Sequence, residues 1–166
     1  MHVIFLEDDP LNSVVVNKDT REVVYNIITP FSLATHKTTI YNAQGLEVAY
    51  YKRQTFAPNE ISYHGQVLPA SDWLQRDGIF SRRVCSSRRF MSPDGRTYKW
   101  KQLNGKSKFQ LIDCETEQVV AESYGTRYGI LSEERDMDIE VSDAVVPILD
   151  VIVLSFIILE KKRRDR

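Results

Sequence analysis

The sequence predicts a mostly β protein in which an antiparallel β-barrel encloses a C-terminal apolar α-helix. Runs rich in β-branched and aromatic residues recur at a spacing of roughly ten residues, with turn residues between them. After these runs, residues 144–159 are apolar except for Asp150 and Ser155. Short strands at this spacing are typical of an antiparallel barrel or sandwich. A helix that is apolar on every face must be surrounded, and the lumen of a barrel can surround it.

Hairpins are expected where two such runs flank a turn. Pro93-Asp94-Gly95 and Asn104-Gly105 are the clearest turn signals, because proline fixes φ and glycine accepts a positive φ. The runs paired in this way are 14–16 with 23–28, 38–41 with 46–51, 61–63 with 66–68, 89–92 with 97–101, 97–101 with 109–112, and 109–112 with 119–124. Residues 137–141 form a last predicted strand. Between the predicted strands, only residues 71–74 suggest a short helical turn.

The predicted domain organisation is one domain over residues 1–166. We expect strands over about 3–142, a central helix over about 144–160 and a basic tail over 161–166. The length of 166 residues suits one ordinary domain, and the chain contains neither an internal repeat nor a linker.

The apolar C-terminal segment has two interpretations. A transmembrane helix needs about 20 apolar residues, and a central Asp would cost about 2.5–3.5 kcal/mol on insertion scales. The run is shorter than that and contains Asp150, so a buried helix is favoured over a tail anchor. A buried Asp150 needs a hydrogen-bond partner, or a place near the helix N-terminus if Pro147 is the first helical residue.

Composition indicates a cytoplasmic protein. The N-terminal residues lack the basic flank and long apolar run of a signal peptide, and the chain has only two cysteines, Cys85 and Cys114. The formal net charge of −1 argues against nucleic acid as the partner.

The order of elements resembles the tubby-like superfamily, which includes the tubby C-terminal domain, the LURP-one-related proteins and the phospholipid scramblases. Residues 90–101 (FMSPDGRTYKWK) and 157–164 (IILEKKRR) are similar to segments of a fungal family of uncharacterised domains in that superfamily. The resemblance implies a twelve-stranded barrel around a C-terminal helix, and lipid or protein binding rather than a reaction. The palmitoylated cysteine run and calcium motif of scramblases are not recognisable in this chain.

Basic residues are concentrated in one stretch and form the candidate site. They are Arg82, Arg83, Arg88, Arg89, Arg96, Lys99, Lys101, Lys106 and Lys108, opposed there only by Asp94. On a strand, Lys99 and Lys101 share one face and Tyr98 and Trp100 the other. Such a patch can bind anionic phospholipid headgroups, or it can be an ordinary solvated sheet face.

Other clusters have weaker chemical interpretations. The acidic residues Glu133, Glu134, Asp136, Asp138 and Glu140 suit either Ca²⁺ or a solvated edge strand. Cys85 lies among arginines, which suits either a reactive thiol or a small core residue. The histidines show no metal-ligand spacing, and neither a phosphate-binding loop nor a nucleophile elbow is present.

The function predicted from the sequence is therefore binding rather than catalysis, with no cofactor. The favoured hypothesis is docking on anionic, phosphoinositide-type membrane surfaces through the basic patch, with the protein peripheral at the membrane. The alternatives are a protein-interaction or regulatory domain without a lipid role, and a tail-anchored protein.

Overall fold

A computed structural model describes residues 1–76, 87–103, 108–124 and 136–165 of the chain. Within these residues, thirteen strands form one antiparallel sheet. The strands are β1 (His2–Phe5), β2 (Ser13–Asn17), β3 (Val23–Ile28), β4 (Thr35–Asn42), β5 (Glu47–Gln54), β6 (Glu60–Tyr63), β7 (Gln66–Pro69), β8 (Gln75–Arg76), β9 (Arg88–Met91), β10 (Thr97–Gln102), β11 (Lys108–Asp113), β12 (Val119–Tyr124) and β13 (Asp138–Val141). The helices are α1 (Ala70–Trp73), a 3₁₀ helix (Asp143–Ile148) and α2 (Leu149–Arg164).

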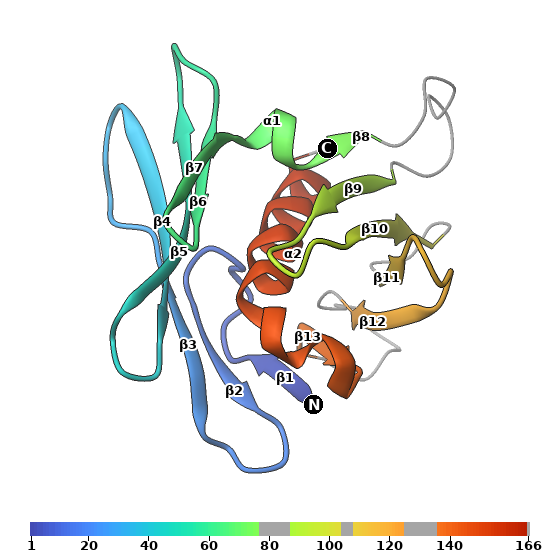
Figure 1. Ribbon diagram of the computed structural model, residues 1–166. Helices are drawn as coiled ribbons and strands as arrows, with labels where there is room; N and C mark the ends of the chain where they lie inside the picture. The colour runs from blue at the N-terminus through green and yellow to red at the C-terminus, as the bar shows by residue number, and fades with distance from the viewer. Residues whose placement is uncertain (77–86, 104–107, 125–135, 166) are drawn as a thin grey trace, which may run out of the picture.

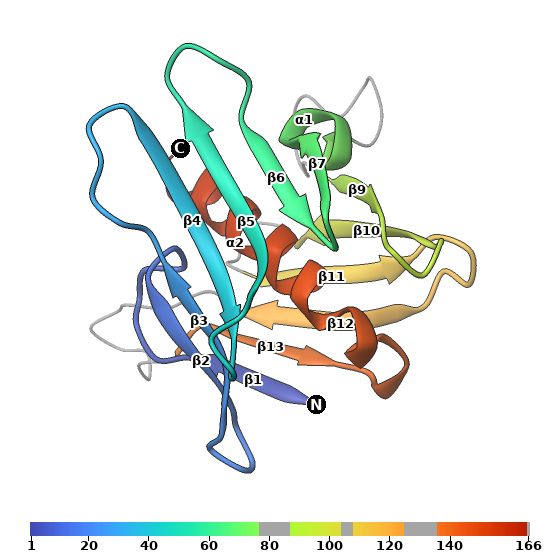
Figure 2. The same cartoon turned by 60° about the vertical axis from the view of Figure 1, so that its left-hand side comes forward.

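The sheet curves around α2, which lies between its two halves (Figure 1; Figure 2). Its strand order is β7-β6-β5-β4-β3-β2-β1-β13-β12-β11-β10-β9-β8. The expected antiparallel β fold with a C-terminal helix is therefore confirmed. Closure into a barrel is not seen in the described residues, because β7 and β8 are the two edges of the sheet. The short helix α1 connects these edges, and Trp73 Nε1 donates to Met91 O at 3.1 Å.

The predicted hairpins are present in the sheet. The pairs β2–β3, β4–β5, β6–β7, β9–β10, β10–β11 and β11–β12 correspond to the expected pairs of runs. The turn predicted at Asn104-Gly105 lies outside the described residues. In the β9–β10 turn, Gly95 adopts a φ of +80°, and its N–H donates to Ser92 O at 3.0 Å. A side chain would resist this backbone conformation, which explains the glycine.

Helix α2 forms the centre of the core, as the burial interpretation expected. Val151, Leu154 and Ile157 have no exposed surface, and Phe156 packs against Phe5 with ring centroids 5.5 Å apart. Trp100 Nε1 donates to Ser155 Oγ at 2.8 Å, so the polar group inside the apolar segment is satisfied by the sheet. The helix extends to Arg164, so the basic residues from position 161 to 164 form its last turn rather than a separate tail.

Asp150 lies in the first turn of α2 and has a partner from a distant hairpin. His64 Nε2 is 2.9 Å from Asp150 Oδ2, and Val151 N donates to Asp150 Oδ1 at 2.8 Å. Pro147 belongs to the 3₁₀ helix that precedes α2. The carboxylate of Asp150 is therefore hydrogen-bonded and lies near the N-terminus of the helix, and these are the conditions that a buried helix sets for this residue.

Over the described residues, no helix combines the length and the apolar character that crossing a membrane requires.

Candidate anion-binding site

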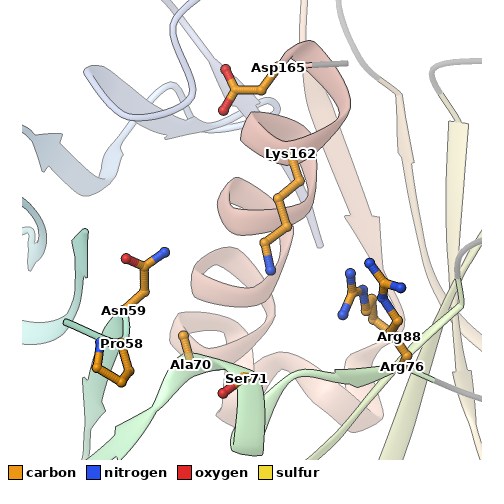
Figure 3. Close-up of a pocket in the computed structure, with 8 residues that line it drawn as sticks. All are labelled: Pro58, Asn59, Ala70, Ser71, Arg76, Arg88, Lys162 and Asp165. Carbon is orange, nitrogen blue, oxygen red and sulfur yellow. The ribbon is translucent and has the colours of Figure 1, made fainter. Parts of the chain in front are cut away.

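A pocket with a volume of about 590 Å³ lies at the end of the molecule where α2 terminates. Figure 3 shows the side chains of Arg76, Arg88 and Lys162 directed into the space between the helix and the surrounding strands. The remaining lining residues are Pro58, Asn59, Ala70, Ser71 and Asp165. Three cationic side chains from three different elements therefore meet in one concave site, and the one acidic group of the lining is Asp165.

Strand register brings the two arginines together. Arg76 of β8 lies directly opposite Arg88 of β9. Arg88 is two residues before Phe90, whose side chain is 1% exposed. Because strand side chains alternate between faces, Arg88 and Phe90 lie on the same, inner face of the sheet. The register therefore holds two guanidinium groups next to each other in the lining of the pocket.

The helix supplies the third cation. Lys162 extends from the last turn of α2 toward Ala70 and Ser71 at the base of α1 (Figure 3). Asp165 forms an ion pair with Lys161, which partly neutralises the one acidic side chain in the lining of the pocket. The lining of the pocket therefore contains three cationic side chains and one acidic side chain.

The wall opposite the arginines is held in place by hydrogen bonds. Asn59 Nδ2 donates to the Tyr51 hydroxyl at 3.0 Å, and Gln54 N donates to Asn59 Oδ1 at 3.0 Å. Burial raises the pKa of the Tyr51 phenol. Asn59 is thus fixed by partners on both sides of its amide.

This set of side chains favours binding over proton transfer. Guanidinium groups remain charged at all physiological pH values and present a planar fork of donors that matches phosphate oxygens. An ammonium beside two guanidinium groups adds a compact third charge. The site has the chemistry to hold a group with more than one negative charge.

The basic patch expected from the sequence is divided by the fold. Of the patch members that the structure describes, Arg88 alone lines the pocket. Lys99 and Lys101 lie on the outer face of β10, opposite the buried Tyr98 and Trp100, as the alternation predicted. Arg89 is the cross-strand neighbour of Lys99, so these three cations form an outer basic strip.

Two other members of the predicted patch are in ion pairs. Arg96 Nη1 lies 3.2 Å from Asp113 Oδ2, and Lys108 Nζ lies 2.6 Å from Glu122 Oε2. The hydrogen bond from Lys108 is the main cause of a lowered pKa at Glu122. Arg82, Arg83 and Lys106 lie outside the described residues.

Sequence reasoning missed Arg76 and Lys162 as members of the site. Arg76 is an isolated basic residue, and its pairing with Arg88 crosses a long connection that carries no local signal. The cluster IILEKKRR did mark the end of a helix, but nothing in it indicates that Lys162 faces β8 and β9.

The other candidate residues that the structure describes do not line the pocket. Asp138 is buried with His2 Nε2 3.1 Å from its Oδ2, while Glu140 is exposed on the outer face. Cys114 is a partly exposed free thiol. Cys85, Glu133 and Glu134 lie outside the described residues. In the described parts of the chain, no group of three His, Cys, Asp or Glu side chains has a metal-binding arrangement.

Comparison with known proteins places the chain in a family without supplying an activity. Residues 8–165 match a family of unknown function (DUF6593), and the chain therefore belongs to that family. No curated protein and no solved structure gives a significant match.

Proposed function

We propose that this member of a family with no assigned activity is a non-enzymatic module that docks on anionic membranes by binding a phosphate-bearing lipid headgroup. The observation that supports the proposal best is the convergence of Arg76, Arg88 and Lys162 in one pocket. A volume of about 590 Å³ lies within the usual range for small-molecule sites, so the pocket is large enough to admit a phosphorylated inositol ring.

The outer basic strip adds a second, less specific attraction. Juxtamembrane Lys or Arg residues contribute about 1 kcal/mol each near an anionic membrane surface. Arg89, Lys99 and Lys101 would act in this way, at long range and with a strong dependence on salt concentration. The pocket would then select the headgroup.

The fold is consistent with a tubby-like identity, which we include in the proposal. An antiparallel sheet that curves around a buried C-terminal helix is the arrangement that the resemblance implies. In this proposal the edges β7 and β8, linked by α1, correspond to the seam of a barrel that is not closed by hydrogen bonds.

Calorimetric titration with soluble inositol 1,4,5-trisphosphate tests the pocket directly. Hydrogen bonds to charged groups contribute about 1.5–3 kcal/mol each, so replacing three cations should weaken binding by well over tenfold. We expect Arg76→Gln/Arg88→Gln/Lys162→Gln to abolish measurable binding. The matched control Arg89→Gln/Lys99→Gln/Lys101→Gln removes the same charge from the outer strip and should retain most of the affinity.

Two results would contradict the proposed function. The first is the absence of binding by the unmodified protein at low salt. The second is binding that survives in the pocket variant but is lost in the outer-strip variant, since the strip alone would then carry recognition.

A further inference from the structure

Three large apolar side chains project into solvent from two loops of the molecule. Phe31 is 89% exposed, Leu33 is 91% exposed and Phe56 is fully exposed. Such side chains are normally covered when they gather at one place on the surface of a protein.

The two loops are neighbours at one end of the sheet. Residues 29–34 connect β3 to β4, and residues 55–59 connect β5 to β6. Thr35, directly after the first loop, pairs with Gln54, directly before the second. Both loops lie at the end of the molecule where α2 terminates (Figure 1; Figure 2).

Hydrogen bonds hold the base of the first loop in place. Thr29 N donates to Asn12 Oδ1 at 2.8 Å, and the hydroxyls of Thr29 and Thr38 are 2.7 Å apart. Thr35 N donates to Ser32 Oγ at 3.3 Å.

The base of the second loop is fixed in the same way. Gln54 N donates to Asn59 Oδ1, and Gln54 Nε2 donates to Pro58 O at 3.0 Å. Hydrogen bonds therefore fix the bases of both loops that carry the exposed apolar side chains.

Charge is arranged in a band behind these tips. Neither loop contains a charged residue, although 27% of the whole chain is charged. Immediately behind them, Lys37 of β4 lies opposite Lys52 of β5, and Arg53 follows Lys52. Lys37 forms an ion pair with Glu47, and Glu60 lies opposite Lys52, so this band contains charges of both signs with an excess of Lys and Arg. An uncharged apolar tip followed by a band with excess positive charge matches the layering of a bilayer surface, where acyl chains lie beneath anionic headgroups.

The second loop also forms part of the basic pocket. Pro58 and Asn59 line the pocket, two and three residues after Phe56.

The acidic residues of the segment 7–9 form hydrogen bonds or ion pairs within the protein. Val14 N donates to Glu7, and Leu11 N donates to Asp9. Arg164 forms an ion pair with Asp8.

From this arrangement we propose that Phe31, Leu33 and Phe56 insert into the interfacial region of an anionic bilayer. The inference rests on the proposed function, because insertion would place the adjacent pocket at headgroup depth. Burial of apolar area from three tips supplies a contribution that the pocket alone cannot, since a soluble headgroup leaves these side chains in water.

Sedimentation with vesicles separates the insertion from headgroup binding. The vesicles contain phosphatidylcholine with or without phosphatidylinositol 4,5-bisphosphate. Loss of one buried apolar anchor weakens partitioning by roughly tenfold, so Phe31→Ser/Leu33→Ser/Phe56→Ser should lose vesicle binding at least a hundredfold. The same variant should bind soluble inositol trisphosphate as tightly as the unmodified protein.

A matched control removes exposed apolar side chains elsewhere. Leu46, Val67 and Val119 are 64%, 55% and 47% exposed, and Leu46 lies in the turn at the opposite end of the β4–β5 hairpin. We expect Leu46→Ser/Val67→Ser/Val119→Ser to bind vesicles normally. Vesicle binding by the loop variant that equals that of the control would overturn the insertion while leaving the pocket proposal intact.

A substitution that retains the apolar tip gives an independent measurement. Phe56→Trp places an indole at the proposed depth, whereas the native Trp73 and Trp100 are buried in the fold. Brominated acyl chains should quench this indole when the protein is bound to vesicles containing the phosphoinositide. Bound protein without quenching would overturn the insertion, and absence of vesicle and headgroup binding by the unmodified protein would overturn both proposals.

Discussion

Asp113 illustrates how a single carboxylate organises the turn between β11 and β12. Its Oδ1 accepts from Glu115 N at 2.8 Å and from Thr116 N at 3.3 Å, while its Oδ2 faces Arg96. The hydrogen bond from the backbone of Glu115, followed by those from Thr116 and the charge of Arg96, lowers the pKa of the Asp113 carboxyl. The charged form is therefore favoured in the folded state.

This lowered pKa gives a stability that depends on pH. The contribution is complete above the unfolded pKa of about 3.9 and is lost as pH falls through the lower folded value. We expect Asp113→Asn to be less stable than the unmodified protein at pH 7, with a difference that shrinks as the solution is acidified below about pH 4. Urea unfolding across this pH range measures the difference.

The exposed Asp19→Asn variant serves as the control for this prediction, and it should show no such convergence. A stability gap for Asp113→Asn that stays constant on acidification would mean that the charge of Asp113 contributes nothing to the fold.

Among the secondary-structure elements, α2 and β10 are joined by a buried hydrogen bond between their side chains. Ser155 accepts from the Trp100 indole at 2.8 Å and also donates to Ile152 O at 2.9 Å. Ser155→Ala leaves the indole N–H buried without this partner, at a cost of about 1–3 kcal/mol in the free energy of unfolding. Chemical denaturation measures this cost.

A second background tests the origin of that cost. In Trp100→Phe protein there is no indole N–H to satisfy, so Ser155→Ala should be much less destabilising there. Equal costs in the two backgrounds would show that the hydrogen bond does not account for the effect.

Elements with local signals could be predicted from the sequence. The turn at Pro93–Gly95 and the alternation along β10 depend on neighbours only a few residues apart, and both predictions are confirmed. The apolar segment also indicated its own burial, because no face of it is suited to water.

Elements that depend on distant partners were not predictable in the same way. Strand β1 is stabilised by pairing with β13, more than 130 residues later. The two-residue strand β8 exists through its pairing with β9. His64 meets Asp150 because the sheet curves around the helix, and neither residue indicates the other in the sequence.

At the scale of the whole molecule, a net charge of −1 conceals an uneven distribution of charge. The density of basic residues over positions 82–108 was visible in the sequence, but only the fold separates its described members into a pocket residue, an outer strip and ion pairs. The pocket itself joins Arg76, Arg88 and Lys162, whose proximity follows from the curvature of the sheet. The proposed role of the exposed apolar loops likewise depends on their position beside that pocket, which the sequence alone does not give.

Hydrogen–deuterium exchange of the protein bound to phosphoinositide vesicles, compared with the free protein, identifies the surface that contacts the membrane. We expect slower exchange in residues 29–34 and 55–59 and at the end of α2, with unchanged exchange in the turns around Gly45 and Gly95. Protection confined to those two turns, or protection spread evenly over the chain, would contradict docking through the pocket end of the molecule.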